Sequence, residues 1–524
     1  MRRQYLTGIG LFLCLVHLLA CPLPLAAEAA GQDLVLFYSN DNHGETEPCG
    51  CEANQLGGLG KRGFQVQRLA AEAGQPHLTV DAGDLLFKQS TIPPGQEKKE
   101  ALRAEAIAEA YSLIGYDAVC VGSRDVIAGI ALLKDLAKQA KFTWLSANLV
   151  DKDTGKPVFA ATLRRQAGAV KATIIGLTGA ADFAPADNVA ILPWQEVLPL
   201  LLQETAKTTD LVILLSNLPA EENRRIAEAY DSVHILIQST AGDGGGIATE
   251  PVNNTLLASS RPQGKDIGVM NITWQPSKRW GCPPAEVLAQ KKSALDSVLW
   301  QLGKYRVDDK DPEVALRDQP ERLKAYRGLL ARERGLQEEI KQIGLCVLGE
   351  EKTPGEPATY RNRFVTLEAT LPDRRDIVAI GDRLDYALNK LGREQAKTQA
   401  LTDSGYLGSE SCAPCHAEQS AAWRKTRHAG AYTTLADKQQ QFNVDCLPCH
   451  VTGVGMDHAS EALAVPEARR GVGCEACHGP GRLHSQGPAA NPMTRKPEAG
   501  VCLACHAPPH DEQFDYERNV QLVH

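Results

Sequence analysis

The feature that most constrains this chain is the pattern Cys-x-x-Cys-His, which occurs four times between residues 405 and 524. Two thiols at this spacing reach the two vinyl groups on one edge of a porphyrin, and the adjacent His then lies under the iron as its proximal ligand. A zinc site uses the same residue types but does not need a His directly after every second Cys. The pattern therefore predicts four covalently bound haem c groups.

The residues that carry this prediction form two sets. The predicted thioether cysteines are Cys412, Cys415, Cys446, Cys449, Cys474, Cys477, Cys502 and Cys505. The predicted proximal iron ligands are His416, His450, His478 and His506. Every cysteine of this region belongs to one of the four motifs, which strengthens the assignment.

Residues 1–30 have the pattern of an export signal, with two arginines at positions 2 and 3 and an apolar run at 11–20. Two cleavage patterns compete. Ala27-Glu28-Ala29 would release a soluble protein, whereas Leu18-Leu19-Ala20-Cys21 resembles a bacterial lipobox with Cys21 as the lipidated residue. The apolar run is too short for a transmembrane span. We expect an exported chain, either periplasmic or lipid-anchored and facing the outside, where disulfides are permitted.

Length and composition limit the remaining possibilities. The 524 residues predict roughly two to four domains, and a hydrophobic content of 43% is enough for ordinary cores. Aromatic residues make up only 5% and no basic stripe is interleaved with them, which argues against nucleic-acid binding.

Apolar runs alternate with helical patterns over residues 32–274. Strand-type runs occur at 34–38, 78–80, 118–121, 142–145, 172–177, 211–215, 233–237 and 268–274. Helical patterns at 97–113, 126–139 and 220–230 separate some of them. This alternation predicts a layered α/β domain, in which ligands gather at the carboxyl ends of the strands.

Three loops after these strands resemble the 5'-nucleotidase branch of calcineurin-like metallophosphoesterases. They read Asp41-Asn42-His43-Gly44, Gly57-Gly58-Leu59-Gly60-Lys61-Arg62 and Asp81-Ala82-Gly83-Asp84. The resemblance implies that Asp41 and His43 bind one metal ion and that Asp84 bridges two. Two such ions activate a water molecule and clamp a phosphate.

Further along the chain the family pattern is lost. Gly122-Ser123-Arg124-Asp125 stands where the family has Gly-Asn-His-Glu/Asp, and Ser216-Asn217 stands where it has Ser-His. Gln238-Ser239-Thr240-Ala241 replaces Gly-His-x-His. Because three ligand positions are lost together, we predict a domain that does not hydrolyse phosphoesters.

Two further cysteines, Cys49 and Cys51, lie between the first two loops of this region. Two interpretations stay open. Together with Asp41, His43 and Asp84, their thiolates would form a replacement site for one divalent metal. Alternatively, they form a disulfide in an exported protein. Cys120, in an apolar strand, is interpreted as a buried thiol.

Residues 285–302 and 312–343 have apolar side chains at helical spacing, which predicts an antiparallel helical hairpin acting as a spacer or a dimerising arm. The hairpin would bring Cys282 and Cys346 together in a disulfide. A strand at 364–370 and a helix at 373–391 follow, and a polar run that begins at Gly392 leads into a linker. The predicted units are residues 1–30, 31–280, 281–395, 396–405 and 406–524.

The last unit resembles the tetrahaem cytochromes c related to the electron acceptor of hydroxylamine oxidation. Matching stretches include Tyr406-Leu-Gly-Ser-Glu-Ser-Cys412, Trp423-Arg-Lys-Thr-Arg-His428 and Gly479-Pro-Gly-Arg-Leu-His484. The resemblance implies a mostly helical and irregular fold with His428, His484 and His524 as distal iron ligands. His458 and His510 have no matching role. If neither binds iron, one haem stays five-coordinate, and the resemblance implies that it is the Cys446–His450 haem.

These features favour an electron carrier whose partners are redox proteins, either other cytochromes or a quinol-linked complex. The first domain would then be a docking module. A second hypothesis is an oxidoreductase that acts on a small nitrogen or sulfur compound at an open haem or at the Cys/His metal site. A third, an active metallophosphohydrolase, conflicts with the lost ligand positions. The sequence does not set the oligomeric state.

Overall fold

The computed structural model describes most of the chain outside its first 31 residues. The described ranges are 32–49, 55–183, 185–239, 249–282, 285–305, 312–317, 319–350, 356–396, 405–443, 446–453, 465–507, 511 and 514–523. Several predictions fall elsewhere: the export segment with Cys21, and the residues Cys51, His458, His510 and His524 lie outside the described part, as does the side chain of Cys49.

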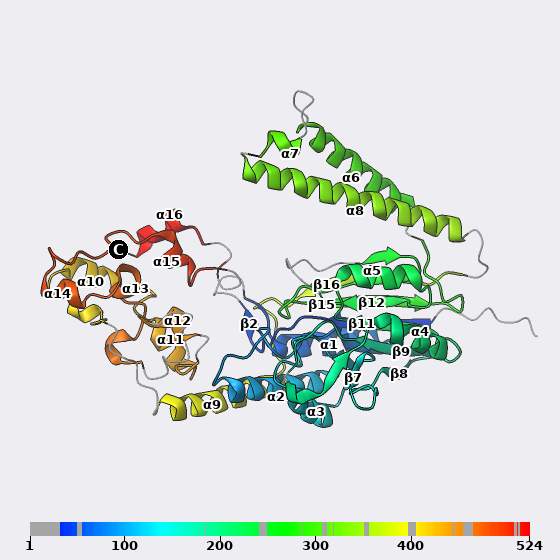
Figure 1. The fold of residues 1–524 in the computed structure, drawn as a ribbon, viewed down its shortest axis with the longest axis horizontal. Helices are drawn as coiled ribbons and strands as arrows, with labels where there is room; N and C mark the ends of the chain where they lie inside the picture. The colour runs from blue at the N-terminus through cyan, green and yellow to red at the C-terminus, as the bar shows by residue number, and fades with distance from the viewer. Residues whose placement is uncertain are drawn as a thin grey trace, which may run out of the picture.

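The N-terminal part contains two six-stranded sheets (Figure 1). The first has the order β16 (Thr359–Thr366), β15 (Asp266–Trp274), β1 (Gln32–Ser39), β4 (His77–Asp81), β5 (Ala118–Cys120), β6 (Thr143–Leu145). The second has the order β13 (Glu250–Val252), β14 (Thr255–Ala258), β12 (Ile235–Gln238), β11 (Leu211–Ser216), β9 (Val170–Leu177), β8 (Thr162–Ala167). Strands β1, β4, β5 and β6 run parallel to one another, and so do β9, β11, β12 and β14.

Alternation along β1 explains how the layers stack. Leu34, Leu36 and Tyr38 point into the core between the two sheets, whereas Val35 and Phe37 pack beneath helices on the outer face. Successive side chains of a strand point to opposite faces, so a strand buried on both sides reads as a continuous apolar run. The predicted layered α/β fold is confirmed.

Helices cover both outer faces. The first sheet is covered by α1 (Leu59–Ala73), α2 (Glu97–Ile114), α3 (Ile130–Gln139) and α9 (Arg375–Ala396). The second is covered by α4 (Trp194–Thr205) and α5 (Ala220–Ala229). Two short strand pairs join β2 (Pro48–Cys49) to β3 (Leu56–Gly57) and β7 (Leu149–Asp151) to β10 (Val189–Ile191). A 3-10 turn spans Pro185–Asp187.

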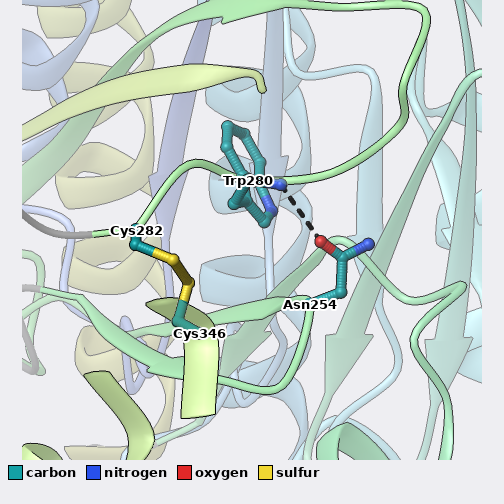
Figure 2. The surroundings of a disulfide bond; sticks show 4 residues. All are labelled: Asn254, Trp280, Cys282 and Cys346. Atoms are coloured by element: carbon teal, nitrogen blue, oxygen red, sulfur yellow. Dashed lines mark hydrogen bonds between the residues drawn. A yellow bond between two sulfur atoms is a disulfide. The ribbon is translucent and has the colours of Figure 1, made fainter. Parts of the chain in front are cut away.

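Helices α6 (Ala285–Gly303), α7 (Pro312–Ala315) and α8 (Pro320–Glu350) form the predicted hairpin, which projects from the layered domain as an arm (Figure 1). Val298, Leu302 and Leu336 make its buried seam. The predicted disulfide is confirmed: Cys282 and Cys346 are bonded at the base of the arm, with Cα atoms 5.5 Å apart. Figure 2 shows this bond beside Trp280, whose backbone N–H donates to Asn254 Oδ1 at 3.1 Å.

The C-terminal part consists of short helices with a small apolar core. They are α10 (Ala417–Trp423), α11 (Ala431–Asp437), α12 (Leu447–His450), α13 (Cys474–His478), α14 (Arg482–Gln486), α15 (Ala499–Leu503) and α16 (Tyr516–Asn519), with 3-10 turns at Ser409–Ser411, Glu467–Arg469 and Val520–Leu522. Only Leu435, Leu447, Val451 and Val465 form a buried apolar cluster there, among the described residues. Across all the described residues of the chain, no helix is both long enough and apolar enough to cross a bilayer.

The C-terminal part meets the layered domain through α9 (Figure 1). Gln440 Nε2 donates to Asp385 Oδ1 of this helix at 3.2 Å, and Phe442 packs against the backbone at Gly392. Since Gln440 Oε1 also lies 3.6 Å from the Cys446 thiol, this contact reaches from the layered domain to the second Cys-x-x-Cys-His motif.

Candidate haem and metal sites

Each of the four motifs folds into a tight helical turn. In the first, the backbone N–H of His416 donates to Cys412 O at 2.9 Å, and in the fourth His506 donates to Cys502 O at the same distance. The second and third motifs overlap α12 and α13. One helical turn brings both cysteines and the His to neighbouring positions. None of the eight motif cysteines forms a disulfide.

Two motif histidines face a second histidine. The ring centroids of His416 and His484 are 6.4 Å apart with planes inclined by 26°, and those of His428 and His506 are 6.1 Å apart with an angle of 64°. A nitrogen ligand binds a metal at about 2 Å, so adding the ring radius at both ends puts two axial imidazoles at roughly 6 Å between centroids. Both pairs therefore fit an iron held from its two sides.

The other ring nitrogen of several histidines is already held by the protein. His450 Nδ1 contacts Ala431 O at 2.7 Å, His478 Nδ1 contacts Thr494 O at 2.6 Å and His484 Nδ1 contacts Asn491 O at 2.9 Å. An acceptor at Nδ1 fixes the tautomer in which Nε2 carries no proton and can bind a metal. Burial, aided by the nearby His506, lowers the pKa of His428, which favours its neutral, ligating form.

Contacts between thiols connect the motifs in the order first, third, fourth, second. Cys412 is hydrogen-bonded to Cys474. Cys477 lies close enough to Cys502 to interact electrostatically. Cys505 is hydrogen-bonded to Cys449. Groups attached at these thiols would therefore lie next to one another along the same order.

Glu475, inside the third motif, ties this motif to the first. Its side chain is only 2% exposed and accepts hydrogen bonds from the backbone N–H groups of Leu407, Gly408 and Gly481 at 2.6–3.0 Å. A buried carboxylate needs such donors. The motif leaves the residue at this position unspecified, so its spacing does not predict the structural role of Glu475.

In the layered domain the carboxyl ends of five strands converge. Loops after β1 and β4 supply Asp41, His43 and Asp84, whose ligand atoms all lie within 4.8 Å of one another. All three residues have positive φ, between 51° and 54°, which is uncommon for residues other than glycine. The sequence prediction placed these three residues together correctly, and they can hold one metal ion.

Hydrogen-bond donors stand at the positions where the family pattern is lost. Ser239 Oγ donates to Asp41 Oδ1, and Ser123 Oγ and the Arg124 backbone N–H donate to Asp84 Oδ1 at 3.3 and 2.8 Å. Asn217 Oδ1 accepts from the Ser123 backbone N–H at 2.8 Å. These groups orient the carboxylates of Asp41 and Asp84. None of them is an imidazole, the kind of ligand that the family has at some of these positions for its two metal ions.

Burial dominates the protonation of this cluster. It raises the pKa of Asp84, with Asp41 adding to the effect, and it lowers the pKa of His43. The neighbouring Asp125, which is 1% exposed and accepts from the backbone of Leu85, Leu86 and Gly122, also has its pKa raised well above the usual value by burial. Both carboxylate oxygens of Asp125 therefore accept hydrogen bonds from the backbone of these loops, and the residue stabilises the loop conformation.

Sequence comparison assigns the C-terminal part. Residues 411–479 match the family model described as "Cytochrome c554 and c-prime". Cytochrome c-554 of Nitrosomonas europaea is 33% identical over 95 residues, which cover 15% of this chain and 40% of that protein. Residues 411–479 thus match the cytochrome c554 family model, and the C-terminal part resembles a c-type cytochrome domain of this kind.

The N-terminal part resembles 5'-nucleotidases. The protein UshA of Escherichia coli is 29% identical over 178 residues, covering 33% of this chain and 30% of UshA. The 5'-nucleotidase of Vibrio vulnificus is 28% identical over 236 residues, covering 42% and 40%. A 5'-nucleotidase precursor from Thermus thermophilus superposes with a TM-score of 0.40 at 23% identity, covering 47% of this chain and 52% of that one. The chain spans two fifths or less of the curated relatives named here, and it joins a 5'-nucleotidase-like domain to a cytochrome c554-like domain.

Proposed function

We propose that this chain is an exported electron carrier with four haem c groups, fused to a 5'-nucleotidase-like domain that does not hydrolyse phosphoesters. The observation that carries the proposal is that His484 and His428, which lie outside the motifs, face the motif histidines His416 and His506. Bound haem would supply reversible one-electron chemistry. His416 with His484, and His506 with His428, would hold an iron and leave it no position open to a substrate. His524, which lies outside the described residues, is proposed as a third distal ligand on the resemblance alone.

The residues of the chain set the order of the haems and their surroundings. The hydrogen bonds Cys412–Cys474 and Cys505–Cys449, with the electrostatic interaction of Cys477 and Cys502, support the order first, third, fourth, second for haems attached at these thiols. The haem bound at Cys446 would lie at the end of this order, beside Gln440 and α9. Electrons would enter or leave through redox partner proteins, either other cytochromes or a quinol-linked complex, with the layered domain as the docking module.

Spectroscopy of the purified full chain tests this proposal. The reduced protein should show c-type bands and a pyridine haemochrome content of four haems per chain, and it should exchange electrons with a small soluble cytochrome. A chain that carries fewer haems, or that cannot be reduced and reoxidised reversibly, would contradict it.

The layered domain is proposed to hold at most one divalent ion, at Asp41, His43 and Asp84, with Cys49 and Cys51 as the additional candidate ligands. The cluster offers ligand atoms within 4.8 Å, and the positions of the lost ligands carry donors to Asp41 and Asp84. Metal analysis after dialysis should give no more than one ion per chain beyond haem iron. Release of phosphate from nucleotides in the presence of Mg²⁺, Mn²⁺ or Zn²⁺, at rates typical of a phosphohydrolase, would overturn the proposal.

A second candidate function rests on His450. Among the described residues no histidine ring is paired with it, although its Nδ1 is held by Ala431 O. A five-coordinate haem there would bind a small nitrogen or sulfur compound and make the chain an oxidoreductase. A high-spin signal that shifts on adding cyanide or nitrite would support this function, and its complete absence would exclude it.

A further inference from the structure

Asp511 lies beside the histidine of the fourth motif. Its Oδ2 is 3.0 Å from His506 Nδ1, and its backbone N–H donates to Ala507 O at 3.1 Å, which holds it in place just after the motif. The ring of Phe514 stacks on the ring of His506 at 4.6 Å and 19°. His506 is therefore fixed by a carboxylate at one nitrogen and by an aromatic face, while His428 lies across from it at 6.1 Å.

The corresponding contacts of other histidines have a different chemistry. His450, His478 and His484 place Nδ1 against the backbone carbonyls of Ala431, Thr494 and Asn491. A carbonyl is a neutral acceptor, whereas the Asp511 carboxylate carries negative charge and accepts more strongly. Binding of iron at Nε2 leaves the proton on Nδ1, so His506 donates to Asp511 and gains basicity as a ligand.

We propose that Asp511 is a positioning residue that lowers the reduction potential of the haem attached at Cys502 and Cys505. A more basic imidazole stabilises ferric iron over ferrous iron, and second-shell hydrogen bonds are one of the means by which a protein sets haem potential. The inference rests on the proposed function, because it needs this haem to be present. Reduction adds one electron to the iron and requires no bond to be made or broken.

The position of this haem between the others determines how its reduction potential would affect electron transfer. Its cysteines lie between those of the third motif and those of the second, through the Cys477–Cys502 and Cys505–Cys449 contacts. In this order, an electron moving between the first two haems and the Cys446–His450 haem would pass through it. A low potential here would make that transfer uphill.

A spectroelectrochemical titration of the full holoprotein tests the inference. Asp511→Asn should raise the reduction potential of one of the four haems by ~59 mV. For a one-electron couple, this shift lowers the oxidised-to-reduced ratio at a fixed potential about tenfold. The couple that moves should be the one disturbed by His428→Ala. Asp511→Glu, which keeps the carboxylate, and Glu517→Gln, which removes an exposed charge in the same segment, should leave it in place.

A second measurement compares two reduction potentials within the unmodified protein, and the variants serve only to assign them to haems. The couple assigned to the His428–His506 haem should lie below the couple assigned, through His484→Ala, to the His416–His484 haem. The inference is overturned if the order is reversed, or if Asp511→Asn binds four haems and leaves every couple unmoved. Fewer than four haems, or no reversible couples, in the unmodified protein would instead reject the proposed function.

Discussion

The imidazole rings of His416 and His484 lie 6.4 Å apart with planes inclined by only 26°. His416 ends the first motif, and His484 lies on α14, beyond the third motif. A loop closed over this sequence distance loses conformational entropy, which an iron bound from both sides offsets. In the proposed electron carrier, a haem held between these two rings would therefore also organise the fold of the C-terminal part.

Removing one facing histidine should open one iron only. In His484→Ala the haem at Cys412 and Cys415 is expected to become five-coordinate and high-spin, because its distal ligand is gone and His416 remains. Electron paramagnetic resonance of the oxidised protein should show one additional high-spin haem. His428→Ala should do the same to a different haem, and a variant that opens two haems, or none, would show that the pairing is wrong.

Replacing Glu475 should lower the free energy of unfolding strongly, although the Cys-x-x-Cys-His motif leaves this residue unspecified. Glu475→Ala leaves three backbone donors at Leu407, Gly408 and Gly481 without their acceptor, which costs about 3 kcal/mol or more. Thermal unfolding followed by Soret circular dichroism should show the loss. Glu410→Gln, on an exposed pair with Arg424, is the matched control and should change stability by less than about 1 kcal/mol.

His234 should make the layered domain sensitive to acid. It is 5% exposed, its Nδ1 accepts from the Val212 backbone N–H at 2.9 Å, and burial, aided by Lys278, lowers its pKa to about 3 from 6.5. Between pH 6.5 and 3 the unfolded chain therefore binds a proton at His234 that the folded chain does not bind. Protonation of this ring costs no free energy of unfolding above pH 6.5. Below that, the free energy of unfolding falls by about 1.4 kcal/mol per pH unit down to about pH 3.

Hydrogen exchange of peptides from β11 and β12 measures this effect. His234→Asn offers an amide oxygen to Val212 without a titrating ring, so exchange in this variant should depend less on pH between 6.5 and 4. Equal pH dependence in the variant and the unmodified chain would refute the assignment to His234.

The disulfide at the base of the arm should hold the hairpin together. Cys282 and Cys346 close a loop with a sequence separation of 64 residues. Chain-entropy arguments put the contribution of such a loop at about 4 kcal/mol. In the double variant Cys282→Ser, Cys346→Ser we expect faster hydrogen exchange in α6 and α8, with β1 and β4 unchanged. Unchanged exchange in the two helices would mean that the apolar seam alone suffices.

Much of the layered domain was predictable because its strands are buried on both faces. Their side chains are apolar throughout, so the runs at 34–38 and 211–215 coincide with β1 and β11. The edge strand β16 was misplaced: it spans Thr359–Thr366, not 364–370. The exposed Arg361 and Arg363 alternate with the half-buried Tyr360, Asn362 and Phe364, because one face of this strand is exposed. A search for apolar runs therefore misses its first half.

Gly392 shows a different limit. A glycine in a polar run was interpreted as the start of a linker, yet α9 continues through it to Ala396. A Cβ at this position would lie 2.4 Å from Phe442 Cβ, so glycine is needed for a close contact between α9 and the C-terminal part. Nothing local in the sequence distinguishes such a contact from a break in the helix.

The candidate sites divide in the same way. Spacing within a motif predicts which residues share a helical turn, and strand ends predict that Asp41, His43 and Asp84 meet. The role of Ser239 could not be predicted, because it depends on a contact with Asp41, 198 positions away in the sequence. Ser239 follows β12 directly, which is the one signal that could have identified it.

The central claim is that the four motifs carry four haems in one electron carrier. The most direct test is intact-mass analysis of the full chain combined with its pyridine haemochrome. We predict a mass increase equal to four covalent haem groups and four haems per chain by absorbance. A chain with three or fewer covalent haems, or with zinc at any of the four motifs, would contradict the account.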